Sequence, residues 1–254
     1  MVKTNIMQES GCRKITESAG CFSLLEYQRD ASVGFQTAVT EYYASRMGVR
    51  KRQVIANLNG NGIIIQAGAM QWTAGNVEAS SNVKGAGDFA KKLIGSKMTG
   101  EAAVKPRYSG FGLMIMEPTY KHILFEEVSA WGSGMVIDDG LFLACEDTVI
   151  NKVVARNTLS SAALGGEGLF NTSLAGRGVA VLESPVPREE LIVMELTEPT
   201  DVVKIDGNYA IAWSESLHFT VERTTKTLLG SAASGEGLVN VYRGVGKILM
   251  APVR

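Results

Sequence analysis

Histidine and cysteine are scarce in this 254-residue chain, which contains only His122, His218, Cys12, Cys21 and Cys145 of these two types. Three cysteines at these wide spacings form neither a disulfide framework nor a Cys-x-x-Cys metal knuckle. A cupin-type oxygenase would need several histidine and carboxylate ligands around one metal ion, whereas each histidine here stands apart from a second ligand in sequence. We therefore predict no metal, no cofactor and a reducing, cytoplasmic compartment, with both histidines in structural roles.

Long apolar runs, strong net charge and abundant aromatic residues are also missing. No stretch approaches the roughly 18 apolar residues of a membrane-spanning helix, and the first twenty residues lack the apolar core of a signal peptide. The net charge is −1, aromatic residues make up 7 %, and the single basic run is Arg50–Arg52. RNA recognition usually combines a basic surface with aromatic stacking platforms, and Trp72, Trp131 and Trp213 lie far apart in sequence. Nucleic-acid binding is therefore not expected.

The familiar catalytic motifs are absent as well. The segment Gly132-Ser133-Gly134 lacks the Gly-x-Ser-x-Gly spacing of a nucleophile elbow, and a flexible turn is the better interpretation. Gly246-Lys247 opens an apolar strand rather than a helix, so it is no phosphate-binding loop. Cys145 ends an apolar run, where a cysteine usually behaves as a small buried hydrophobe. The sequence thus predicts a protein that is not an enzyme.

What the chain has in quantity is glycine, 28 residues against 6 prolines, and these glycines repeat. A Gly-Glu-Gly-Leu block and then a Gly-x-Gly pair precede a short apolar run in two copies, with a weaker third copy upstream. The blocks begin at Gly166, Gly235 and Gly100, the Gly-x-Gly pairs at Gly176, Gly244 and Gly110, and the runs end before Pro185, Pro252 and Pro118. This period of roughly 70 residues suits a small unit of about six strands.

The residue types give this repeat a physical interpretation. Asp139-Gly140 and Asp206-Gly207 are turn dipeptides that reverse the chain between strands. The Gly-x-Gly pairs are expected between an alternating strand and a short apolar strand, where glycine indicates a bulge or a close approach of two backbones. Val179–Leu182 and Ile248–Met250 are predicted to be strands buried on both faces. The repeated Glu101, Glu167 and Glu236 are expected to accept hydrogen bonds from turn N–H groups, a structural role.

Helices are expected to be few and short. Phe89–Ile94, with Lys91-Lys92, reads as one helical turn before a glycine cap, and 159–164 and 227–233 are candidates at matching positions. Apolar residues at helical spacing predict a helix over 39–47, ended by Gly48. Asn59-Gly60 predicts a hairpin turn between the strands 54–58 and 63–65.

These glycine blocks resemble the altered inheritance of mitochondria family, whose fold is classed with the trp RNA-binding attenuation protein. The resemblance rests on Gly166–Phe170, Ser234–Leu238, the following Gly-x-Gly pairs and Gly68-Ala69-Met70, and it covers roughly residues 50–254. It implies three β-sandwich-like units related by pseudo-threefold symmetry, and self-association. Mitochondrial members are associated with inner-membrane organisation, and the fold name alone does not imply RNA binding.

We therefore expect an all-β chain of three tandem β-sandwich-like repeats in a pseudo-threefold arrangement, with a few short helices. The expected divisions are an N-terminal extension with a strand and a short helix (1–48) and repeats at 49–120, 121–187 and 188–254. Because repeated β units expose edges that must be covered, we expect a homo-oligomer that acts as a non-enzymatic scaffold, with room for a protein partner. Two alternatives stay open: a small-molecule-binding protein or enzyme with a pocket between the repeats, and an RNA-binding protein.

Overall fold

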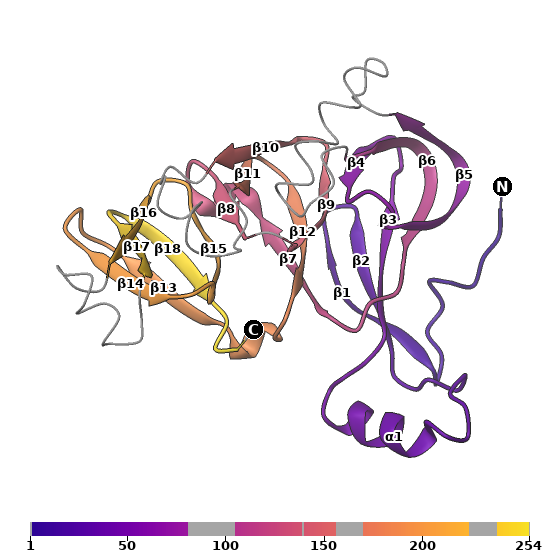
Figure 1. Ribbon diagram of the computed structural model, residues 1–254. Coiled ribbons are helices and arrows are strands. Elements are labelled where there is room, and N and C mark those ends of the chain that lie inside the picture. Colours follow the sequence, from indigo (N-terminus) through magenta and orange to yellow (C-terminus); the bar gives the residue numbers. More distant parts are fainter. Residues whose placement is uncertain (1, 81–104, 139, 156–169, 224–237, 254) are drawn as a thin grey trace, which may run out of the picture.

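A computed structural model describes residues 2–80, 105–138, 140–155, 170–223 and 238–253 of the chain. This part of the chain is mostly β-structure, which confirms the predicted all-β class (Figure 1). The N-terminal segment contributes β1 (Arg13–Ala19), β2 (Phe22–Tyr27) and α1 (Ala38–Arg46). The strands that follow are grouped below as units 1, 2 and 3, and the domain boundaries drawn from the sequence stay predictions.

In the described residues, units 2 and 3 each contain six strands, while unit 1 contains four, two of them long. Unit 1 consists of β3 (Arg52–Asn57), β4 (Gly62–Ile65), β5 (Met70–Ser80) and β6 (Arg107–Met116). Unit 2 consists of β7 (His122–Glu127), β8 (Met135–Ile137), β9 (Phe142–Glu146), β10 (Val149–Ala155), β11 (Phe170–Gly176) and β12 (Val179–Ser184). Unit 3 consists of β13 (Ile192–Leu196), β14 (Val202–Asp206), β15 (Ala210–Ser214), β16 (His218–Arg223), β17 (Leu238–Arg243) and β18 (Gly246–Met250). Two 3₁₀ turns, Val128–Trp131 and Arg188–Glu190, follow β7 and β12.

The sheets do not coincide with the units, because each unit gives one strand to the sheet of the next. A nine-stranded sheet has the order β1-β2-β3-β6-β4-β9-β12-β7, with β5 paired to β6, so β4 of unit 1 joins β9 of unit 2. A six-stranded sheet has the order β10-β11-β8-β15-β18-β13, so β8 of unit 2 joins β15 of unit 3. A three-stranded sheet, β14-β17-β16, completes unit 3. All of these pairings are antiparallel.

Two of the hydrophobic cores lie across these junctions. One core combines unit 1 and unit 2 side chains, among them Ile63, Ile65, Met114, Leu143, Ala144 and Val181. Another combines unit 2 and unit 3 side chains, among them Trp131, Met135, Ile137, Ile211, Ala212 and Leu249. Strands buried on both faces, such as Val179–Leu182 in β12, are continuous apolar runs, as predicted. Successive units therefore stabilise one another by sharing apolar surface.

The first Gly-x-Gly pair brings two backbones together, as predicted. Gly110 has φ +120°, and a Cβ atom there would collide with the carbonyl oxygen of Asn76 on the paired strand β5. A Cβ atom at Gly112 would collide with the carbonyl oxygen of Ala74 in the same way. These two glycines lie in the long strand β6, which continues through the point where units 2 and 3 begin a new strand. Glycine is required here by the close approach of β5 and β6.

One predicted pairing is wrong, and one predicted helix is confirmed. Asn59 and Gly60 do form a turn with positive φ, but β3 and β4 are not a hairpin, because β6 lies between them and pairs with both. The predicted helix over 39–47 is confirmed as α1, and Gly48 follows it with φ +80°. The proposed helices at 89–94, 159–164 and 227–233 lie outside the described residues.

Candidate functional site

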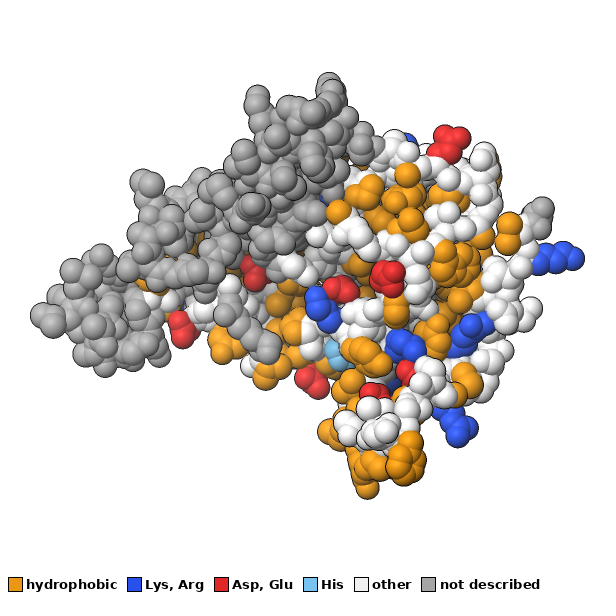
Figure 2. All heavy atoms as spheres, turned by 45° about the vertical axis from the view of Figure 1, so that its right-hand side comes forward, with side chains coloured by type: hydrophobic (Ala, Val, Ile, Leu, Met, Phe, Trp, Pro, Cys, Tyr) orange, Lys and Arg blue, Asp and Glu red, His pale blue; other side chains and the backbone are white. Residues whose placement is uncertain are grey.

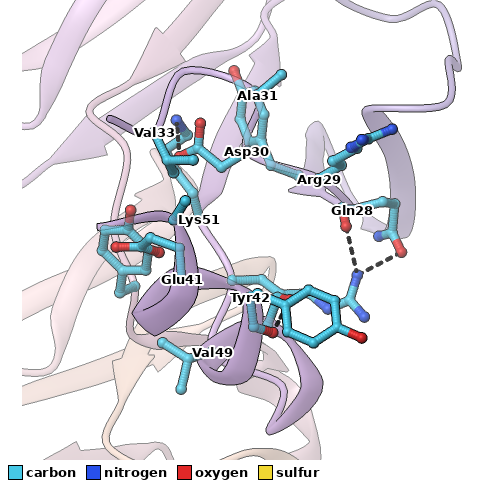
Figure 3. Close-up of a pocket in the computed structure, with 14 residues that line it drawn as sticks. Gln28, Arg29, Asp30, Ala31, Val33, Glu41, Tyr42, Val49 and Lys51 are labelled. Atoms are coloured by element: carbon cyan, nitrogen blue, oxygen red, sulfur yellow. Dashed lines mark hydrogen bonds and ion pairs between the residues drawn. The ribbon is translucent and has the colours of Figure 1, made fainter. Parts of the chain in front are cut away.

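A cavity of about 390 Å³ lies in the N-terminal segment, between α1 and the loop that follows β2 (Figure 3). Its walls come from the end of β2, the loop 28–33, helix α1 and the segment 49–51, with Tyr120 from the β6–β7 connection. Three tyrosines, Tyr27, Tyr42 and Tyr120, provide aromatic surface, and charged side chains of both signs provide the polar part. This cavity is large enough for a small ligand, although it does not lie between the units, where the sequence placed one.

Several charged side chains in this cavity are held by partners within the protein. Lys51 donates a hydrogen bond to Asp30 over 2.9 Å, and the Asp30 carboxylate also accepts from the Ser32 hydroxyl. The Ser32 hydroxyl, and after it the Lys51 ammonium, lower the pKa of Asp30 to about 2. The Arg50 guanidinium donates to the side-chain oxygen of Gln28 over 2.8 Å. Because Lys51 and Asp30 neutralise each other, and a carboxylate with this low pKa is a weak base, the pair is suited to holding the loop rather than to acid–base chemistry.

Helix α1 carries an exposed apolar surface. None of its residues is buried, and Tyr43 is 65 % exposed. Phe35 ahead of the helix is 93 % exposed, and Met47 after it is 82 % exposed. Figure 2 shows these hydrophobic side chains gathered on the projection below the sheets. Concentrated exposed apolar surface of this kind is typical of sites that contact another molecule.

A second cavity of about 390 Å³ lies beside His122, between the N-terminal segment and the second 3₁₀ turn. Its wall contains Arg52, whose buried guanidinium donates to Glu26 and to the carbonyl oxygens of Gly48 and Tyr120. Burial, and after it the Arg52 charge, lower the pKa of His122 below its ordinary value, so this imidazole is neutral at pH 7. Arg52 therefore connects three segments of the chain, and His122 lies beside this connection.

The two histidines do not meet. His122 begins β7 at the edge of the nine-stranded sheet, and His218 begins β16 in the three-stranded sheet. Within the part of the chain that the structure describes, no three His, Cys, Asp or Glu side chains cluster in a way that would hold a metal ion.

The cysteine, tryptophan and basic residues singled out in the sequence take up structural positions. Cys145 is fully buried, as predicted, and burial raises the pKa of its thiol to about 12. Trp131 donates its ring N–H to Glu126 over 3.1 Å, and Trp213 packs against Phe219 and Tyr242. The members of the basic run 50–52 pair with Gln28, Asp30 and Glu26. The repeated glutamates 101, 167 and 236 and the lysines 91 and 92 lie outside the described residues.

A further feature, which sequence reasoning missed, is that β14 and β5 are among the strands with one edge that has no partner strand in the described residues. The outer edge of β14 ends the three-stranded sheet, and β5 pairs only with β6. These two strands lie at opposite ends of the molecule (Figure 1). The sequence does carry a signal for the strands at these positions. A short apolar or mixed run stands ahead of each glycine turn, at Ile63–Ile65, Met135–Ile137 and Val203–Ile205.

The family model described as Mitochondrial biogenesis AIM24 matches residues 47–253. The chain belongs to this family. The matched region takes in all three units, whereas the first 46 residues, with β1, β2 and all of α1, precede it. The cavity beside α1 and its apolar surface are therefore built largely from residues outside the family region.

Two proteins of Streptococcus pyogenes are similar to this chain, and neither is described by an activity. An uncharacterised protein of Streptococcus pyogenes serotype M6 is 26 % identical over 198 residues, which cover 75 % of this chain and 76 % of the relative. The crystal structure of another Streptococcus pyogenes protein superposes with a TM-score of 0.59 at 23 % identity, covering 81 % of this chain and 89 % of the other. This likeness shows the fold. No helix within the described residues has the length and apolar character needed to cross a membrane.

Proposed function

We propose that this chain is a non-enzymatic scaffold protein that self-associates in the cytoplasm. The observation that carries the proposal is the way the chain joins its own units. Each junction adds a strand of one unit to the sheet of the next, and the series ends at β14 and begins at β5 with the corresponding edges unpaired in the described part. Unpaired strand edges favour pairing with another chain. A series of units joined by strand addition can therefore continue from one molecule to the next.

Two further properties of the described residues agree with this proposal. The exposed apolar surface around α1 gives the protein a second contact region, separate from the strand edges. In both cavities several polar groups hold segments of the chain together, among them Lys51 with Asp30 and Arg52 with Glu26 and Gly48.

The experiment that tests the proposal is the mass of the full chain in solution as its concentration increases. Sedimentation velocity and native mass spectrometry, from submicromolar to high micromolar protein, should show a concentration-dependent multimer. A monomer at every concentration, in both methods, would contradict self-association. High salt serves as the control, because strand pairing and apolar contacts persist when surface charges are screened.

A second candidate is a small-molecule-binding protein, and the cavity beside α1 favours it. Its tyrosines and paired charges, in a volume of about 390 Å³, are of the kind that bind a polar ligand with an aromatic or apolar part. Native mass spectrometry of protein purified gently from its own host decides between the two. A ligand of defined mass that is lost on Tyr42→Ala, but kept on the exposed control Tyr43→Ala, would favour this second function.

A further inference from the structure

The two junctions inside the chain follow one register rule. In both, three residues at the end of one strand pair antiparallel with the last three residues of the partner strand, and an isoleucine lies opposite an alanine. The pairs are Ile65–Ala144, Ile64–Cys145 and Ile63–Glu146 for β4 with β9, and Ile137–Ala212, Val136–Trp213 and Met135–Ser214 for β8 with β15.

The same hydrogen bonds flank both junctions. At one end, Gln66 N–H donates to the Leu143 carbonyl over 2.8 Å, and Asp138 N–H donates to the Ile211 carbonyl over 2.9 Å. Leu143 and Ile211 are the residues skipped where the register of β9 and β15 shifts against β12 and β18. The bulge therefore turns one carbonyl toward the neighbouring unit.

The third copy of each junction strand can be located by the same rule. Strand β14 takes the place of β4 and β8, because it pairs with the preceding part of its unit in the same register. The matching pairs are Val203 with Tyr242 on β17, Ile63 with Tyr108 on β6 and Met135 with Leu174 on β11. The first half of β5 takes the place of β9 and β15, because its register against β6 shifts between Met70 and Trp72, with Gln71 skipped. Both positions of a third junction therefore exist in the chain, and neither is filled in the described part.

We propose that β14 of one molecule adds antiparallel to β5 of a second copy, with Ile205 opposite Trp72, Lys204 opposite Thr73 and Val203 opposite Ala74. The proposal rests on self-association and names its interface. A second copy is the partner because the two edges of one molecule lie at its opposite ends (Figure 1). The contact is head-to-tail, so it extends into a ring or a filament rather than stopping at a symmetric dimer.

Donor directions on β14 fit this pairing. Gln66 and Asp138 donate across the internal junctions, and their counterpart on β14 is Asp206. Successive N–H groups of an antiparallel strand point to alternate sides, so the N–H of Lys204 faces the open edge as well. Proline at position 204 would therefore remove a donor of the new contact, while the bonds of β14 to β17 stay.

Cysteine cross-linking tests the register directly. Cys12 is exposed and is replaced by serine, whereas Cys21 and Cys145 stay, because burial raises the pKa of both thiols to about 12. Chains with Lys204→Cys are mixed with chains with Thr73→Cys under mild oxidation. Facing residues in antiparallel strands have Cα atoms about 4.5–5.5 Å apart, within disulfide range. We expect a disulfide-linked dimer of the two variants, found by non-reducing electrophoresis and peptide mass spectrometry.

The matched control is Val193→Cys with Thr73→Cys. Val193 is 56 % exposed and lies on β13, another sheet edge, so a random collision would cross-link it equally well. Equal yields from the two mixtures would overturn the proposal. A chain carrying both Lys204→Cys and Thr73→Cys should form a ladder of multimers, and a disulfide formed only within one chain would overturn it too.

A backbone variant separates this inference from the proposed function. Lys204→Pro should abolish the multimer seen in sedimentation while the circular dichroism spectrum and thermal unfolding stay those of the parent. If the multimer persists in Lys204→Pro and the cross-link is absent, the protein self-associates through another surface, and only the interface assigned here is wrong. If the parent chain is a monomer at every concentration, both the interface and self-association fail.

Discussion

The junctions inside the chain and the open edges at its two ends share one backbone scheme but differ in their side chains. At the inner junctions the facing side chains are mostly buried, as with Ile137 and Ala212, both 0 % exposed. At the ends, Lys204 and Thr73 are exposed. If the proposed contact between copies forms, it buries less apolar surface than the inner junctions and is therefore expected to be reversible, because apolar burial supplies most of the free energy of such contacts.

Polar links add to this difference. Arg107 of unit 1 pairs with Asp147 of unit 2, and Ser173 of unit 2 donates to Glu215 of unit 3 over 3.1 Å at the corresponding position. At the ends, the corresponding positions are Val241 and Gly75, which offer no side-chain hydrogen bond. The proposed third junction therefore lacks both the buried apolar side chains and the side-chain hydrogen bonds of the first two.

The largest effect is expected from truncating an inner junction. Ile137→Ala should lower the free energy of unfolding by about 2–5 kcal/mol, because a buried side chain is replaced by a cavity. Urea unfolding followed by tryptophan fluorescence measures this loss. The control Val202→Ala, at an open edge and 46 % exposed in the parent, should change it by less than about 0.5 kcal/mol. Equal losses at the two sites would remove the distinction between inner and outer junctions.

Part of the fold could be predicted from the sequence, and the rest could not, for physical reasons. Glycine pairs such as Gly110 and Gly112 reveal close backbone approach, because only glycine fits there. The turn at Asn59-Gly60 was readable in the same way. A turn dipeptide indicates only a local reversal of the chain, so it could not predict that β6 lies between the two strands that flank the turn.

The joining of units could not be predicted either, because the sequence of a three-residue strand such as β8 is too short to indicate which strand it pairs with. The exposure of α1 also escaped, because apolar residues at helical spacing normally indicate a buried face, whereas here Val39 is 68 % exposed. No candidate site was predicted from the sequence, and the cavity beside α1 is assembled from β2, α1 and the distant Tyr120.

A smaller effect is expected where a side chain holds the start of a neighbouring strand. Glu146 accepts hydrogen bonds from the backbone N–H groups of Cys21 and Val179, and Ser214 accepts one from Lys247 in unit 3. Glu146→Ala leaves two N–H groups without this acceptor, so we expect a loss of about 1–3 kcal/mol in urea unfolding.

The corresponding position in unit 1 is Ala74, which has no acceptor to lose. The variant Glu146→Gln keeps one side-chain oxygen and should retain part of the stability. An unchanged unfolding midpoint in Glu146→Ala would show that water replaces the carboxylate at both N–H groups.

A third variant should strengthen the outer contact by making it resemble the inner ones. Lys204→Ile places an apolar residue at the position of Ile64 and Val136, opposite Thr73 of the next copy. A cross-strand pair contributes about 0.2–1 kcal/mol, so the multimer should form at a concentration lower by about 1.4- to fivefold in sedimentation. Lys204→Gln, which removes the charge but adds no apolar surface, is the control. Weaker assembly in Lys204→Ile would mean that the lysine contributes to the contact.

The smallest effect is expected from pH, in the sheet that contains β14. Arg243, and after it the Thr220 hydroxyl, lower the pKa of Glu222 to about 2 from an ordinary value of 4.5. A carboxylate with a lowered pKa stabilises the folded state above its ordinary pKa, and this stability is lost as pH falls from 4.5 towards 2. Because both side chains are about one-third exposed, the loss should stay below about 1 kcal/mol.

Urea unfolding of the parent and of Glu222→Gln, near pH 6 and about pH 3, measures the difference. The glutamine variant should start less stable and lose less on acidification. The Lys204 ammonium also lowers the pKa of Glu222, although least among the causes, so Lys204→Ile should reduce the acid sensitivity slightly. If Lys204→Ile instead abolished the acid sensitivity, the charge at the open edge would be coupled to the sheet more strongly than to a neighbouring molecule. The exposed lysine would then stabilise unit 3 itself, and its place at the open edge would no longer explain why that contact is weaker than the inner junctions.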